Sequence, residues 1–168
     1  MVVFRLVPVL IEGIEYQSPV AEPPATTPVA TLVPREVDST LFFETGAVQA
    51  GYASRNESVL VQSFVGWLGH EAVARWAIRV PEENIVLLTD IYDPDDGVLY
   101  EAKASSARGS VRLALGQLLD YRRHIPVDGL RSRVLVPSRP GKDLVSLLNQ
   151  HSVGLAWADE GGGFQIED

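Results

Sequence analysis

Hydrophobic positions in the middle of the chain first repeat with the period of a helix. Apolar residues recur three and four positions apart from Val59 to Leu68, which is the spacing of one buried helical face. Ser54 precedes this stripe and Glu57 follows three residues later, an arrangement typical of a capping box at a helix N-terminus. The pattern therefore predicts a helix that begins near Ser54 and ends by Gly69.

Short apolar runs separated by turn residues come next and predict strands. The segment Asp93-Pro94-Asp95-Asp96-Gly97 has the composition of a tight turn, so the runs on either side of it predict a hairpin. The three expected strands are Val73–Val80, Asn84–Tyr92 and Val98–Ala104.

Helical and strand patterns alternate in the last third of the chain. A long helix is expected to run from Ser106 or Ser110, either of which can cap it, to about His124. The remaining expected elements are a strand at Arg133–Val136, a helix at Lys142–Gln150 and a last strand at Val153–Trp157. A helix, a three-strand antiparallel meander, a helix and a strand, with flanking helices, predict an α/β fold with a mixed sheet and one long helical crossover.

The beginning of the chain has a different composition. Val2–Tyr16 is rich in Val, Leu and Ile, whereas Gln17–Glu36 contains five prolines. We therefore expect a strand segment at 1–16, a proline-rich linker at 17–52 and one α/β domain at 53–168. The strand segment is expected to be the tail of an upstream recognition domain, and the alternative is a strand that docks on the main domain.

Composition restricts the classes of protein. Hydrophobic residues make up 46% of the chain and charged residues 21%, which is typical of a globular protein in water. No apolar run is long enough to span a bilayer, and the apolar start lacks the cleavage pattern of a signal peptide. We therefore expect a cytoplasmic protein without a membrane partner. The chain has no cysteine, which excludes disulfides, thiolate catalysis and Cys-ligated zinc.

Charge is distributed unevenly along the chain. Nine basic residues oppose two acidic ones from Lys103 to Lys142, so this segment carries +7, whereas the rest carries −15 of the net −8. A basic segment beside a carboxylate cluster suits a polyanionic substrate whose cleavage needs a cation. The alternative is that these arginines are only solvated surface residues.

Two carboxylates and a lysine are expected to meet on the predicted hairpin. If Asp93 pairs with Val98, then Asp90 stands opposite Glu101, and opposed side chains lie about 5 Å apart. Lys103 lies two residues beyond Glu101 and shares its face. The opposite face is expected to receive a second group of residues, namely Ile91, Leu99 and Ala102.

Such a cluster has two interpretations. Two close carboxylates repel each other unless something compensates, and Mg²⁺ favours one or two carboxylates together with water and phosphate oxygens. The ammonium of Lys103 could orient or deprotonate a water, or neutralise developing charge. The alternative is a cross-strand salt bridge on a solvated sheet face.

A glutamine and a tyrosine lie one turn apart on the long predicted helix. Gln117 and Tyr121 are separated by four residues and therefore share a helix face. They could hold phosphate oxygens, a metal-bound water or Lys103. By themselves they would also fit an ordinary amphipathic helix.

Taken together, these motifs resemble the PD-(D/E)XK superfamily, the restriction-endonuclease-like fold. The matching residues are Asp90, then Glu101-Ala102-Lys103, then Gln117-Leu118-Leu119-Asp120-Tyr121. The last stretch is similar to the Gln-x-x-x-Tyr signature of RecB-type nucleases. The resemblance covers about 53 to 157, and Thr89 stands where the family name has proline.

The resemblance implies a Mg²⁺-dependent nuclease that hydrolyses DNA phosphodiester bonds, with Mn²⁺ able to substitute. Asp90, Glu101 and the Ala102 carbonyl would bind the metal, and Lys103 would be the catalytic lysine. Gln117 and Tyr121 would be accessory site residues. The domain would belong to a restriction, defence or DNA-repair endonuclease, and double-strand cutting would favour a homodimer.

Other residues have more than one interpretation. The family often has an acidic residue on its first helix, which would be Glu57, whose other interpretation is the capping role; Glu71 is the alternative. Arg108, Arg112 and Arg122 are candidates for DNA contacts. The alternative function is a catalytically silent DNA-binding or protein-interaction module of the same fold, which the acidic net charge favours.

Overall fold

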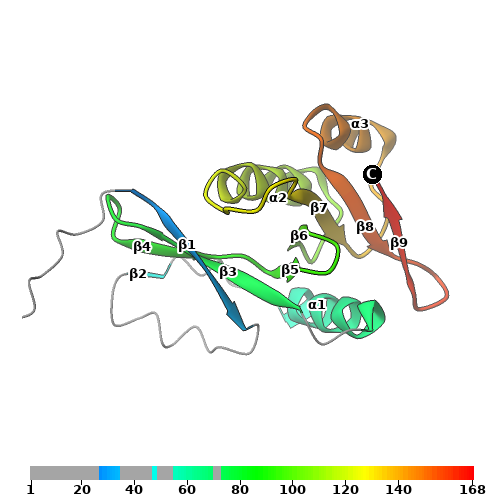
Figure 1. The fold of residues 1–168 in the computed structure, drawn as a ribbon. Helices are drawn as coiled ribbons and strands as arrows, with labels where there is room; N and C mark the ends of the chain where they lie inside the picture. Colours follow the sequence, from blue (N-terminus) through cyan, green and yellow to red (C-terminus); the bar gives the residue numbers. More distant parts are fainter. Residues whose placement is uncertain (1–26, 35–46, 49–54, 70–72) are drawn as a thin grey trace, which may run out of the picture.

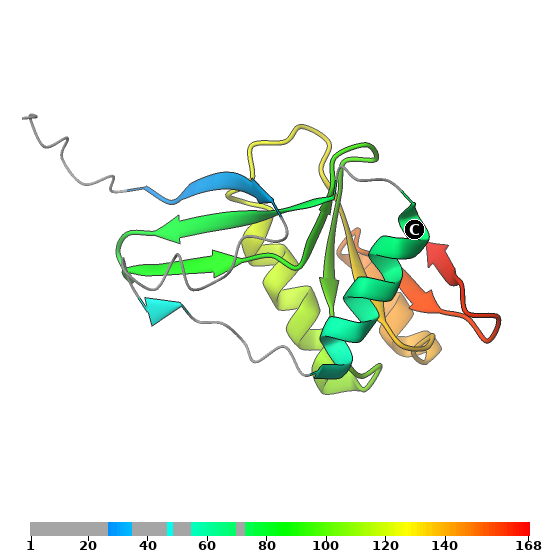
Figure 2. The same cartoon turned by 90° about the horizontal axis from the view of Figure 1, so that it is seen from below.

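The chain forms a mixed sheet with helices on both faces. The computed structural model describes residues 27–34, 47–48, 55–69 and 73–168, and these ranges contain three helices and a nine-stranded sheet (Figure 1). Helix α1 (Arg55–Leu68) covers one face, and α2 (Arg108–Tyr121) and α3 (Lys142–Gln150) cover the other. Figure 2 shows α1 in front of the sheet with α2 and α3 behind it. The expected α/β class is confirmed.

The strands form one continuous sheet. They are β1 (Val29–Pro34), β2 (Ala47–Val48), β3 (Ala74–Val80), β4 (Ile85–Leu88), β5 (Ile91–Asp93), β6 (Val98–Ala102), β7 (Arg131–Val136), β8 (Gly154–Ala158) and β9 (Phe164–Glu167). Their order is β2-β4-β3-β5-β6-β7-β8-β9, with β1 paired to β3. β3 pairs antiparallel with β5, and β5 with β6, whereas β6, β7 and β8 run parallel because α2 and α3 return the chain between them.

The expected elements are present with three corrections. The predicted strand Asn84–Tyr92 is interrupted, so that it forms β4 and β5. Neither Ser106 nor Ser110 caps α2, because its N-cap residue is Ala107 and no side chain caps it. A ninth strand, β9, follows the predicted last strand and pairs antiparallel with it.

Two strands fall inside the range that composition assigned to a linker. β1 pairs with β3 over six residues, and β2 pairs in parallel with β4. Part of the range 17–52 therefore belongs to the sheet of the main domain. The expected strand segment at 1–16 and the capping residue Ser54 lie outside the described residues.

The core has two parts, one on each side of the sheet. α2 buries Val111, Leu115 and Leu118 against residues of β3, β5 and β7, with Trp76 and Tyr92 in the same cluster. On the other side, the ring of Phe64 in α1 packs edge-on against Tyr100, with ring centroids 4.8 Å apart, and against Phe164 of β9, at 4.9 Å.

Leu99 lies on the α2 side of the sheet, in the same cluster as Tyr92. The expectation that it shares a face with Ile91 and Ala102 is wrong, because Leu99 and Ala102 are three residues apart and side chains alternate along a strand. Ile91, Tyr100 and Ala102 form the α1 side.

None of the described helices is long and apolar enough to cross a membrane.

We expect Phe64→Ala to lower the free energy of unfolding by about 3–5 kcal/mol, because Phe64 is fully buried between α1, β6 and β9. The exposed Leu113 of α2 provides a control, and Leu113→Ala should change stability by no more than about 0.5 kcal/mol. Urea denaturation of both variants measures the difference. Equal stabilities would contradict the packing of α1 against this face.

Candidate functional site

The predicted site residues come together where three elements meet. Asp90 lies in the interruption between β4 and β5, Glu101 and Ala102 end β6, and Lys103 follows directly. The register predicted for the hairpin is confirmed, since Asp93 pairs with Val98. Glu101 is 2% exposed and Lys103 8% exposed, and Asp90 is partly buried, so the alternative of a solvated sheet face is wrong.

The carboxylate of Asp90 is hydrogen-bonded to the backbone of β6. Its Oδ2 accepts a hydrogen bond of 2.8 Å from the backbone N–H of Ala102. This bond fixes one oxygen of Asp90 beside the end of β6.

Lys103 folds back over the last residues of β6. Its Nζ donates to Glu101 Oε1 at 2.7 Å and to the Ala102 carbonyl at 2.8 Å. Its own backbone N–H bonds the Leu135 carbonyl of β7 at 2.9 Å. The ammonium is therefore held by two oxygens on a strand that is anchored to its parallel neighbour.

Glu57 reaches this cluster from the first turn of α1. Its Oε2 accepts a hydrogen bond of 3.2 Å from the backbone N–H of Ala104. Its charge also acts on Asp90, Glu101 and Lys103. The structure thus brings Glu57 to the site, whereas Glu71 lies outside the described residues.

Burial dominates the electrostatics of the two carboxylates. It raises the pKa of Asp90 from 3.8 to about 6, and Lys103 and the Ala102 N–H oppose that shift. Burial and then the nearby Asp90 carboxylate raise the pKa of Glu101 well above its usual value. Burial would lower the pKa of Lys103, but Glu101 and Asp90 outweigh it, so the pKa of Lys103 is raised. The lysine is therefore a charged ammonium in this environment.

Gln117 and Tyr121 pair with each other along α2. Gln117 Nε2 donates to the Tyr121 hydroxyl at 3.1 Å. Burial raises the pKa of Tyr121, and the charges of Glu101 and Asp90 add to the effect, which places this tyrosine within electrostatic reach of both carboxylates. Among the described residues, no group hydrogen-bonds to the buried Oε1 of Gln117.

Arg75 of β3 is a residue that the sequence analysis did not select. It is half-buried, and its charge lowers the pKa of Asp90. Arg75 alternates with apolar strand residues like any exposed position, so no sequence signal distinguishes it.

The arginines predicted to contact DNA are all exposed but differ in their bonding. Arg108 forms an ion pair with Asp143 of α3. Arg122 donates to the His151 carbonyl at 3.3 Å. Arg112 has no ion pair within the described part of the chain.

The donor set fits a divalent cation. Glu101 Oε2 is buried and has no hydrogen-bond partner in the described ranges, which is costly for an anionic oxygen without a compensating charge. Within the same ranges, no three or more His, Asp and Glu side chains are grouped as a metal cage. Mg²⁺ requires fewer protein ligands than such a cage, since one or two carboxylates with water and substrate oxygens suffice.

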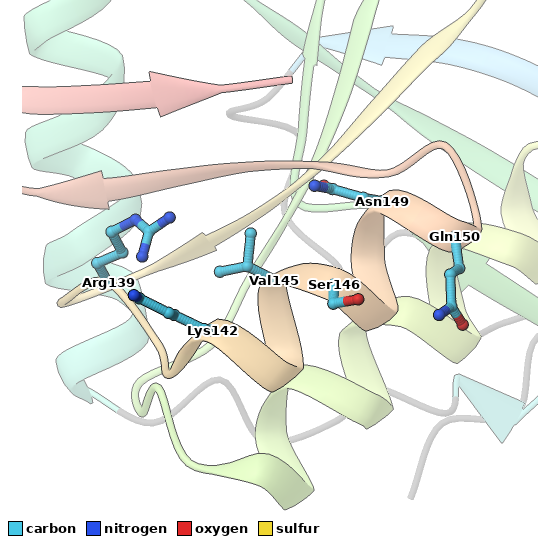
Figure 3. A pocket seen from close by; sticks show the side chains of 6 residues that line it. All are labelled: Arg139, Lys142, Val145, Ser146, Asn149 and Gln150. Atoms are coloured by element: carbon cyan, nitrogen blue, oxygen red, sulfur yellow. The ribbon is translucent and has the colours of Figure 1, made fainter.

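A separate concave surface lies beside α3 (Figure 3). It is lined by Arg139, Lys142, Val145, Ser146, Asn149 and Gln150. Arg139 is occupied there, because its guanidinium bonds Glu167 at 2.8 Å and lies over the Trp157 ring at 5.6 Å. None of the predicted catalytic or metal-binding residues lines this surface.

Comparisons with protein-family models, with curated proteins and with solved structures give no match.

We expect the stability of the wild-type protein in chelator to fall as pH rises from about 4 to 7. The native state binds a proton on Asp90 more tightly than the unfolded state, since the native pKa is about 6 and the unfolded value is about 3.9. The native state then holds more protons in this window, so its free energy of unfolding decreases with pH.

Asp90→Asn keeps an oxygen that can accept from Ala102 but removes the charge. It should reduce this loss of stability by up to about 3 kcal/mol, whereas Asp128→Asn on an exposed turn should leave it unchanged. Urea denaturation at several pH values provides the measurement. If the stability of Asp90→Asn depends on pH as that of the wild type does, then the pKa of Asp90 is not raised in the native state.

Proposed function

We propose that this chain carries a metal-dependent nuclease site of the PD-(D/E)XK type that hydrolyses DNA phosphodiester bonds. The cluster of the buried Glu101 and Lys103 with the partly buried Asp90 at the end of β6 supports this proposal most strongly. A salt bridge alone would satisfy Lys103, but it leaves a second carboxylate beside it and one oxygen of Glu101 without a partner among the described residues.

The order and direction of the elements also support the proposal. α1 precedes the antiparallel strands β3, β4, β5 and β6, and β6, α2 and β7 then form a parallel crossover. This arrangement agrees with the restriction-endonuclease-like core that the motifs resemble. Asp90 lies between β4 and β5, Glu101 lies on β6, and Gln117 and Tyr121 lie on α2.

Each residue would have a distinct part in the reaction. Asp90 and Glu101, with the Ala102 carbonyl, would hold Mg²⁺ or Mn²⁺, and such an ion supplies Lewis-acid polarisation of the phosphate and a more acidic water. Lys103 keeps its charge, so it would neutralise negative charge that develops on the phosphate and orient the water, in preference to removing a proton. Gln117 would present its unpaired carbonyl oxygen beside the site.

The wider setting belongs to the same proposal. A domain of this kind would serve a restriction, defence or repair endonuclease in the cytoplasm, with an upstream domain that selects the DNA. Two copies acting together would cut both strands of a duplex. Arg108, Arg112 and Arg122 would contact phosphates outside the reacting bond.

We expect wild-type protein to nick plasmid DNA or degrade single strands with Mg²⁺ or Mn²⁺ but not with chelator. Lys103→Met should lower the rate by about 10²–10³-fold, because it removes the charge that faces the reacting phosphate. Lys142 is exposed and is the other lysine of the chain, so Lys142→Met is the matched control and should cut at the wild-type rate.

Thermal melts must first establish that both variants fold. Equal cutting by the two lysine variants would remove Lys103 from the site. If the folded wild-type protein, tested also with its natural upstream domain, cuts no form of DNA but binds it, the catalytically silent module becomes the better description.

A further inference from the structure

An extra residue interrupts the strand that carries Asp90. Ala77 of β3 pairs with Leu88, and Ala74 of β3 pairs with Tyr92. Between these two pairs the chain advances four residues from Leu88 to Tyr92 but only three along β3. Two residues, Asp90 and Ile91, therefore oppose the single residue Arg75. This is a β-bulge, a feature that often redirects a side chain next to a functional site.

Thr89 bonds both backbone groups of Trp76 at the edge of the bulge. Its N–H donates to the Trp76 carbonyl at 3.0 Å, and its Oγ1 accepts from the Trp76 N–H at 2.8 Å. In a regular antiparallel pair the carbonyl of Thr89 would accept that second bond. Thr89 is 1% exposed, so the hydroxyl is part of the core and not a chance surface contact.

A second side-chain oxygen accepts a backbone N–H on the β6 side. Ile91 pairs with Tyr100, and continuing this register places Thr89 opposite Ala102. The N–H of Ala102, which faces this side of β6, donates to Asp90 Oδ2. Side-chain oxygens of Thr89 and Asp90 thus accept backbone N–H groups of β3 and β6 on the two sides of the interruption.

We propose that Thr89 is a positioning residue for the candidate metal site, and this inference rests on the function proposed above. Its hydroxyl accepts the Trp76 N–H and fixes the bulge to β3, which holds the next residue, Asp90, where its carboxylate accepts the Ala102 N–H. The same geometry explains the departure from the family name, since a proline at 89 would lack the N–H that bonds Trp76.

The test compares Thr89→Val with Thr89→Ser. Valine has nearly the shape of threonine but cannot accept the Trp76 N–H, whereas serine keeps the hydroxyl. Leu148→Ala provides a control that is destabilised elsewhere, because Leu148 is fully buried on α3 and is not part of the site. Three quantities are measured for each protein. NMR in chelator gives the hydrogen-exchange rate of the Ala102 amide relative to that of the Val134 amide. Calorimetry gives the affinity for Mn²⁺, and a cleavage assay gives the rate at saturating Mn²⁺.

We expect Thr89→Val to raise the relative exchange of Ala102 and to weaken Mn²⁺ binding, each by about tenfold or more. Thr89→Ser should stay within about threefold of wild type, and Leu148→Ala should lose stability without changing either quantity. The inference is overturned if Thr89→Val behaves like Leu148→Ala, or if Thr89→Ser fails as badly as Thr89→Val.

The two proposals can fail separately. A wild-type protein that cuts no DNA while Thr89→Val loses Ala102 protection and Mn²⁺ affinity would reject the nuclease and retain the positioning role. A wild-type protein that cuts DNA, together with a Thr89→Val variant that cuts and binds Mn²⁺ equally well, would reject only the positioning role.

Discussion

The site depends on two carboxylates, one fully and one partly buried, that lie beside one ammonium. Lys103 bonds one oxygen of Glu101, and although its charge also acts on Asp90, the pKa of that carboxyl remains raised to about 6. The helices on both faces exclude water, which makes this imbalance of charge costly in the native state. A core selected for stability alone would place an apolar residue at one of these positions, so the cluster lowers stability, as the proposed function requires if a cation is to bind there.

The sheet determines where this imbalance lies. β6 has an antiparallel neighbour on one side and a parallel neighbour on the other, and its pairing with β5 stops at Tyr100 whereas its pairing with β7 continues to Ala102. Its last N–H groups alternate between the two neighbours: Ala102 bonds Asp90, and Lys103 bonds Leu135. Three residues in succession, Glu101, Ala102 and Lys103, therefore have fixed directions, which is the rigidity that a set of metal ligands and a charged side chain requires.

Much of the fold and of the central motif could be predicted from the sequence, because both depend on local repeats. Helix α3 was predicted with its observed bounds, Lys142–Gln150, since its apolar spacing is regular. The register of Asp93 with Val98 followed from one turn of recognisable composition. Glu57 was one of two acidic candidates, and no local pattern could show that α1 brings it to the backbone of Ala104.

The interruption at Thr89 could not be predicted for a different reason. An extra residue in one strand is defined by the pairing partner, and the run from Asn84 to Tyr92 has no sign of a break in its own composition. The ninth strand was missed in the same way, because it is defined by its pairing with β8, and the three glycines before it belong to the turn that returns Phe164 to the core under α1.

Charge along the sequence also gave an incomplete picture of the surface that a polyanion would meet. The segment from Lys103 to Lys142 has a large positive excess in one dimension, but acidic residues from outside it pair with several of its arginines. Asp143 pairs with Arg108, Glu167 with Arg139, and Asp168 with the buried Arg133. The positive charge available to a polyanion is therefore smaller than the count implies, and the chain as a whole is acidic. A phosphate that approaches the two carboxylates would be repelled unless a cation bridged them, so the same charges that make the site costly in the free protein would make binding of the proposed DNA substrate depend on metal.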